Sequence, residues 1–281
     1  MILHYIGSCV IAMNDNQSNS RLDDLARTFT AEYLEESLQN KTAMSSVLKF
    51  HQQTTWQNVG DFEVEARLNE WIGLVQCNDI LPEYYQEKYK FDVKKDTKTE
   101  GNTKRIFDKA TPLAYQTIGE ILHTAFGFAD GYQTKPFPSA GALYPVIPIL
   151  VIISENAVEK LLPGVYAFDS QKTELLLIKN LNEEEILNIS KNIYGENLSD
   201  VFLCYSVDIR RAITKYRTRG YRHALIEVGL MAQSFRVAIE KQDHLGDCLI
   251  SGFNDNALGS ILGINPRIAP IALTQWFGKY L

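Results

Sequence analysis

The sequence has few of the features that mark metal-bound or disulfide-bonded proteins. It contains four cysteines in 281 residues, none of them in a CxxC pair, and its five histidines do not cluster with the cysteines. We therefore expect neither a disulfide framework nor a metal site, and a reducing cytoplasm fits this cysteine content.

The chain also lacks an excess of positive charge and any long apolar run. Its formal net charge is -6, which disfavours binding to nucleic acid phosphates or to an anionic membrane surface. No segment reaches the roughly 18 apolar residues that a membrane helix needs. The opening MILHYIGSCVIAM has no basic region before its apolar part, so it predicts an N-terminal strand rather than a signal peptide. We expect a cytoplasmic protein that binds neither nucleic acid nor membrane.

Hydrophobic residues make up 45% of the chain and charged residues 22%, as in an ordinary globular protein. The stretch 86–104 is charged and nearly free of aliphatic side chains, which predicts a linker or a surface arm. We place the domain boundary there, with a helical N-terminal extension over 1–95 and the main domain over 96–281.

Hydrophobic periodicity predicts the elements of both parts. Spacings of three and four residues predict helices over 21–40, 64–76, 113–126, 183–194 and 212–241, with a short helix after Asp255. Asn182 and Glu185 are spaced to cap the helix over 183–194. Continuous apolar runs predict buried strands over 146–153 and 201–209, and GVYAFD followed by ELLLIKN predicts a hairpin. Strands that alternate with helices indicate an α/β or α+β fold.

The most informative stretch is TKYRTRGYRHALIEVG (214–229), at the expected start of the long helix. It brings together the basic and aromatic residues Lys215, Tyr216, Arg217, Arg219, Tyr221 and Arg222. Cations at a helix N-terminus oppose the helix dipole, so an anionic partner would suit them. The alternative is a solvated basic turn.

Two further stretches place small residues where a flat ligand could approach the backbone. In KPFPSAGALYP (135–145) these are Ser139, Ala140 and Gly141, just before a buried strand. In LISGFNDNALG (249–259), Gly252 has the same property, and Asn254 or Asp255 can cap the helix that follows. Each loop taken alone is of a common kind.

Together and in order, these motifs resemble those of one family. PSAGALYP, GVYAFD, KYxxRGYRHALIEVGxxAQ and GFNDxxLxxxLG are similar to the pattern of SagB-type, thiazole- or oxazole-forming dehydrogenases of the nitroreductase superfamily. The resemblance covers roughly 100–278, and FHQQT (50–54) is similar to the family's N-terminal signature. It implies an α+β fold in which helices flank a central mixed sheet, and a homodimer with FMN at its interface.

The resemblance also implies which residues bind FMN. NTKRIF (102–107) matches the phosphate motif, with Asn102 where the family's first arginine stands and Lys104 able to compensate. The loop over 138–141 would line the flavin ring, and the turn at 251–252 would face flavin N5. The implied cofactor-binding residues are Thr103, Arg105, Pro138, Ser139, Ala140, Gly141, Arg219, Arg222, Ser251, Gly252 and Lys279.

Lys215 and Tyr216 match the family's catalytic pair. Forming an azole from an azoline removes a proton from the carbon that bears the carbonyl and a hydride from the neighbouring carbon. A nearby ammonium favours the phenolate form, so Lys215 would prepare Tyr216 to act as the base. The alternative for Tyr216 is a buried tyrosine whose hydroxyl is simply satisfied.

Three functions are therefore compared. The first is azoline oxidation on a ribosomally made peptide, with a cyclodehydratase as partner, and the lysine–tyrosine pair favours it. The second is an NAD(P)H-dependent flavin reductase of nitro, ene or dehydroamino-acid groups, which needs no substrate-side base. The third is a non-catalytic scaffold of a peptide-modifying complex, which would bind no flavin.

Overall fold

The computed structural model describes residues 15–56, 66–75, 84, 86–89, 103–128, 134–194 and 198–281. The predicted N-terminal strand and most of the predicted arm over 86–104 lie outside these residues, as does Asn102. The division into 1–95 and 96–281 therefore stays a prediction.

The centre of the fold is a six-stranded sheet with the strand order β3-β2-β1-β4-β6-β5. Its strands are β1 (Val146–Ile152), β2 (Gly164–Asp169), β3 (Glu174–Asn180), β4 (Val201–Val207), β5 (Leu245–Ile250) and β6 (Ile271–Lys279). Every pairing between these strands is antiparallel. The α+β class is confirmed, but the expected mixed sheet is wrong for the described strands. Strand direction depends on how distant segments pair, which local patterns do not reveal.

The strands form where the apolar runs predict them. β1 and β4 lie side by side in the middle of the sheet and are buried almost throughout. Alternate residues of these strands face two separate cores, with Leu150 and Leu203 in one and Val151 and Phe202 in the other. The predicted hairpin is confirmed as β2 and β3.

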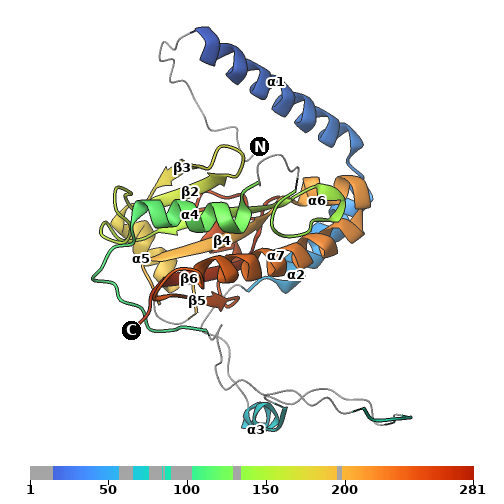
Figure 1. Ribbon diagram of the computed structural model, residues 1–281. Coiled ribbons are helices and arrows are strands. Elements are labelled where there is room, and N and C mark those ends of the chain that lie inside the picture. Colours follow the sequence, from blue (N-terminus) through green and yellow to red (C-terminus); the bar gives the residue numbers. More distant parts are fainter. Residues whose placement is uncertain are drawn as a thin grey trace.

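Helices cover both faces of the sheet (Figure 1). The α-helices of the described residues are α1 (Asp15–Leu38), α2 (Lys41–Thr54), α3 (Ala66–Val75), α4 (Tyr115–Phe126), α5 (Glu183–Lys191), α6 (Ile209–Tyr216), α7 (Thr218–Ile239) and α8 (Asp255–Ile261). α4 and α7 pack together over one face with α2 and α6, whereas α5 and α8 pack on the other. Among the described residues, no helix has the length and apolarity that crossing a membrane requires.

Most predicted helices are present within a few residues of their expected ends. The capping arrangement of α5 is confirmed, because the Asn182 side chain accepts from the Glu185 N–H and the Glu185 carboxylate accepts from the Asn182 N–H. α2 was not predicted. Its Ala43 and Val47 are buried in the larger core, so this part of the N-terminal region belongs to the same packed body.

The predicted long helix over 212–241 is two helices. α6 ends at Tyr216, Arg217 has a positive φ of 51°, and α7 begins at Thr218. Gly220 explains the sharp bend, because a Cβ there would lie 1.9 Å from the Ala212 carbonyl oxygen. Only glycine allows the two helix backbones to approach this closely.

Candidate functional site

Lys215 and Tyr216 form the last turn of α6 rather than the start of a long helix. The Asp208 side chain caps the other end of α6 by accepting from the Arg211 N–H at 3.1 Å. A cation in a last turn interacts favourably with the negative end of the helix dipole. The expected conflict between Lys215 and a helix N-terminus is therefore wrong, because the chain bends at Arg217.

The small-residue loop lies directly against this pair. A Cβ at Gly141 would lie 2.7 Å from Tyr216 Oη and 2.9 Å from Lys215 Nζ. Gly141 also has a positive φ of 66°. The Ser139 hydroxyl accepts from the Tyr144 N–H at 2.9 Å, and this hydrogen bond closes the loop that contains Gly141. The loop and the pair, which are separated by over 70 residues in the sequence, thus meet at one place.

Tyr216 is held between charged and aromatic neighbours. The Lys215 ammonium is 5.2 Å from the centroid of the Tyr216 ring. The His223 ring meets the Tyr216 ring edge to face, with a centroid distance of 5.0 Å and an interplanar angle of 76°. Lys215 is exposed and Tyr216 is partly buried, so the pair borders solvent.

A buried carboxylate lies behind the loop, and the sequence reasoning did not find it. Glu227 on α7 is 2% exposed, and it accepts hydrogen bonds from the Ser139 hydroxyl and the Val146 N–H. Burial raises the pKa of Glu227, against the effect of these bonds and of the Lys135 and Arg211 charges. Helical spacing from the buried Ala224 would have placed Glu227 on the inner face, which is the signal that could have revealed it.

Lys135 lies in the loop that precedes β1, and its charge acts on this carboxylate. Its ammonium lies 5.1 Å from the Phe128 ring centroid and 5.2 Å from the Tyr144 ring centroid. Burial lowers the pKa of Lys135 to about 8, although the charge of Glu227 acts in the opposite direction. Cation–π contacts partly replace the water that the ammonium loses.

The expected phosphate-binding residues form a second group. The segment that contains Thr103 and Arg105 runs beside the end of β6, where the Asp108 N–H donates to the Lys279 carbonyl at 2.7 Å. Thr103 and Arg105 are exposed. Lys104 is engaged elsewhere, because its ammonium lies 4.4 Å from the Tyr280 ring centroid.

A buried ion pair fixes this segment to the sheet. Asp247 on β5 is 3% exposed and is bound by the Arg236 guanidinium through two hydrogen bonds of 2.8 Å. The Asp247 carbonyl accepts from the Lys104 N–H at 2.9 Å. The two donors of Arg236 match the two oxygens of Asp247, and this geometry makes the pair rigid. The position of Arg105 therefore depends on α7 and β5.

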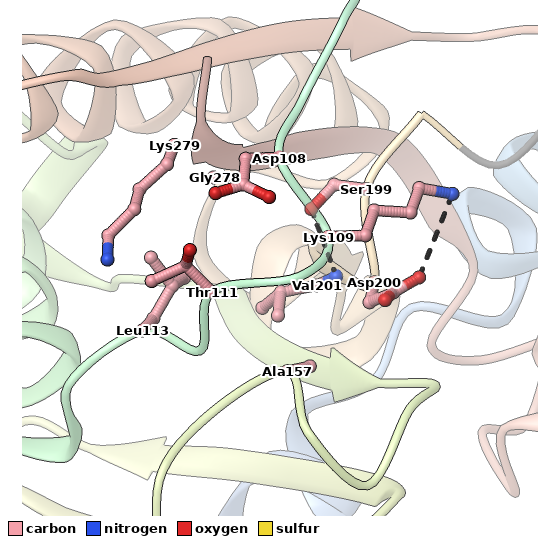
Figure 2. A pocket seen from close by; sticks show the side chains of 10 residues that line it. All are labelled: Asp108, Lys109, Thr111, Leu113, Ala157, Ser199, Asp200, Val201, Gly278 and Lys279. Carbon is pink, nitrogen blue, oxygen red and sulfur yellow. Dashed lines mark hydrogen bonds and ion pairs between the residues drawn. The ribbon is translucent and has the colours of Figure 1, made fainter. Parts of the chain in front are cut away.

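Lys279 lies in a separate pocket at the end of β6 (Figure 2). Its side chain shares this pocket with Asp108 and Thr111, and Arg105 is not among the lining residues. Hydrogen bonds from Thr111 lead the causes that lower the pKa of Asp108, and the charge of Lys279 adds to them. The charge of Lys279 thus acts on a carboxylate of this chain.

The expected flavin N5 turn follows β5. Ser251 is exposed, and the Gly252 carbonyl accepts from the Tyr194 N–H at 2.7 Å. The Trp56 N–H, just after α2, donates to the Asp255 carboxylate at 2.9 Å. A Cβ at Gly252 would lie 3.0 Å from the Tyr194 Cβ, so this turn has little room for a larger residue.

α2 is attached to the start of α7 by a buried hydrogen bond. His51, within the FHQQT stretch, lies with its Nδ1 2.7 Å from the Tyr221 Oη. Burial lowers the pKa of His51 and raises the pKa of Tyr221 to about 12. Arg219 and Arg222, on the same turn as Tyr221, are exposed.

The two groups of expected site residues lie toward opposite ends of α7. Gly220 marks the end beside Tyr216, and Arg236 marks the end that holds Asp247 and, through it, the Arg105 segment. These two positions on α7 are separated by about 24 Å along the helix axis. The pocket that Tyr216 lines contains none of the expected phosphate-binding residues Thr103, Arg105 and Lys279. Within the ranges that the structure describes, no cluster of metal-ligating side chains was found.

Comparison with known proteins identifies the family. Residues 102–279 match the family described as "Nitroreductase family", which is more than half of the chain. The chain therefore belongs to the nitroreductase family, as the sequence motifs predicted.

Two relatives extend this result. The Escherichia coli microcin B17-processing protein McbC is 31% identical over 171 residues, which cover 59% of this chain and 62% of McbC. The alignment therefore spans less than two thirds of that relative. A chain of the E. coli microcin synthetase McbBCD complex with truncated pro-MccB17 bound has a TM-score of 0.77 at 22% identity. That match covers 89% of this chain and 97% of the other, and it shows a shared fold.

Proposed function

We propose that this protein is an FMN-dependent dehydrogenase that oxidises thiazoline or oxazoline rings in a ribosomally made peptide. The observation that carries the proposal is the contact between Gly141 and the Lys215–Tyr216 pair. The reaction removes a proton and a hydride from adjacent carbons, so it needs a base beside the hydride acceptor. Similarity to McbC, a microcin B17-processing protein, supports a peptide substrate.

The residues of this site would divide the reaction between them. Tyr216 would take the proton from the ring carbon that bears the carbonyl, and the Lys215 ammonium would favour the phenolate form that accepts it. FMN, when bound, supplies the acceptor for the hydride from the neighbouring carbon. The absence of a side chain at Gly141 would let the flat substrate and cofactor approach the Tyr216 hydroxyl.

The second group of residues fits the other end of FMN. Arg105 and Thr103 are exposed and can give a phosphate a charge-assisted and a neutral hydrogen bond. The backbone of Ser251 and Gly252 would face the flavin ring. Lys279 is assigned less directly, because its side chain lies in the pocket of Asp108.

We also propose that FMN binds at the interface of a homodimer. The residues expected to bind the FMN phosphate, Thr103 and Arg105, lie toward one end of α7. Tyr216 and the loop over 138–141 lie toward its other end in the same chain, so a second copy would bring the two sets of residues together. The outer face of α7 supports this arrangement, because Ile226, Leu230 and Val237 are 57%, 37% and 45% exposed. Apolar side chains at this helical spacing form a continuous stripe, which a second copy would bury.

The N-terminal extension over 1–95 would serve the peptide or the dimer. α1 projects from the body, and its Leu25, Phe29 and Tyr33 are exposed on one side of the helix (Figure 1). Such an apolar stripe would suit a leader peptide or a partner chain. We further propose that the protein works in the cytoplasm beside a cyclodehydratase, which would supply the azoline.

The test is turnover of an azoline-containing peptide by the purified protein. We expect a yellow dimer that releases FMN on denaturation. It should lower the mass of the peptide by about 2 Da per ring, because two hydrogens pass to the cofactor. A yellow protein that instead consumes NAD(P)H and reduces nitro or ene compounds would support the flavin reductase alternative. A colourless protein that takes up no FMN would contradict both and favour a scaffold.

A further inference from the structure

Behind Tyr216 lies a small pocket to which the azoline reaction assigns no role. It lies between the loop before β1 and the bend that joins α6 to α7. Its lining includes Ser139, Tyr216, His223 and Glu227. The space is small and has room for about one water molecule.

Two buried polar atoms at this pocket have no hydrogen-bond partner in the protein. They are Oε1 of Glu227 and Nδ1 of His223. The Glu227 carboxylate accepts hydrogen bonds from the Ser139 hydroxyl and the Val146 N–H, and its Oε1 remains free to accept another. Leaving such an atom unsatisfied is unfavourable, and a bridging water would give both atoms a partner.

We propose that this pocket is the proton exit of the site, in which Glu227 receives through one water the proton that Tyr216 has taken from the substrate. Glu227 does not touch the substrate and acts through Tyr216. The inference rests on the proposed azoline oxidation, and it adds the step that returns Tyr216 to the form that can accept another proton.

The step balances without any change of oxidation state. The substrate C–H bond breaks and its proton forms the Tyr216 O–H bond. That O–H bond then breaks as its proton moves to the water, while the water gives another proton to Oε1 of Glu227. Glu227 finally releases this proton to solvent. His223, whose ring packs against Tyr216, orients the water through Nδ1.

The charges around Glu227 suit a group that exchanges a proton. Burial disfavours its carboxylate form, whereas Lys135 on the loop and Arg211 on α6 favour it. Tyr216 and His223 are the other titratable groups that border the pocket. An ordinary exposed glutamate would stay ionised through the neutral range, so the burial is what enables Glu227 to hold a proton.

The first experiment needs no substrate. Infrared spectra of the FMN-loaded protein are recorded across a pH titration for wild type, Glu227→Gln, Tyr216→Phe and the control Glu240→Gln, an exposed glutamate just after α7. We expect a protonated-carboxyl band that titrates in wild type and in Glu240→Gln and is missing in Glu227→Gln. Its midpoint should shift in Tyr216→Phe. If no band is lost with Glu227, or if Tyr216→Phe leaves it unmoved, the proposal is overturned.

The second experiment measures azoline turnover. Glu227→Gln keeps the size of the side chain and an oxygen for Ser139, so FMN content and KM should stay within about twofold while kcat falls about 10²-fold, as for loss of a proton-transfer group. Glu227→Ala should recover part of its kcat with added formate, which a purely structural role would not allow. Normal kcat in Glu227→Gln would refute the proton exit. An inactive wild type would refute azoline oxidation instead, and the infrared result would still decide the role of Glu227.

Discussion

Gly141→Ala is the sharpest test of the assembled site. The added methyl would lie 2.7 Å from Tyr216 Oη and 2.9 Å from Lys215 Nζ, whereas carbon contacts settle near 3.5–4.0 Å. Both polar atoms would have to move by up to about 1 Å. Alanine at a positive φ also costs about 1–2 kcal/mol. We expect a loss of unfolding free energy of about that size.

The effect on turnover should exceed the effect on stability. A displacement of about 1 Å at a reacting group can lower the rate about 10²-fold. Urea unfolding would give the stability, and the rate of azoline-to-azole conversion would be followed by peptide mass. Gly119→Ala is the matched control, because nothing lies within 4 Å of a Cβ at this position in α4. It should leave turnover unchanged. Wild-type turnover in Gly141→Ala would show that this contact has no part in the reaction.

Three further outcomes are expected. Arg105→Ala should weaken FMN binding by about 1.5–3 kcal/mol, because a charge-assisted bond to the phosphate is lost. FMN titration measures this, and the control Arg267→Ala, at an exposed arginine, should bind FMN as wild type does. Equal FMN affinities of the two variants would contradict the assignment of Arg105. Tyr216→Phe should remove about 10²–10⁴-fold of the turnover and Lys215→Ala should also lower it, while both variants stay yellow, and loss of FMN in either would move that residue to cofactor binding. Lys135 has its pKa lowered by burial from 10.5 to about 8, so the unfolded chain binds more protons between these values and wild-type stability should gain from this group as pH rises through them. Urea unfolding at pH values near 8 and near 10.5 should show this gain in wild type and not in Lys135→Met. An identical pH dependence of stability in both proteins would refute the assignment to Lys135.

The sequence predicted the parts of the fold whose signals are local. The apolar runs at β1 and β4 and the turn between β2 and β3 are short-range patterns, and the structure confirms them. The capping box of α5 likewise depends on residues three apart. α2 was missed because KTAMSSVLKFHQQT mixes polar and apolar residues, and its burial depends on contact with α6 and α7.

The motifs in the sequence also determined the family and the residues worth examining, because each motif combines residue types whose chemistry suits a flavin site. Only the tertiary structure decided how they meet. Gly220 had to lie against the Ala212 backbone before the chain could bend after Tyr216 and turn it toward Gly141. The buried Glu227 and the separation of Arg105 from Tyr216 likewise arise from contacts between segments far apart in the chain. Spacing along the sequence carries no record of such contacts, since they follow from how helices pack on the sheet.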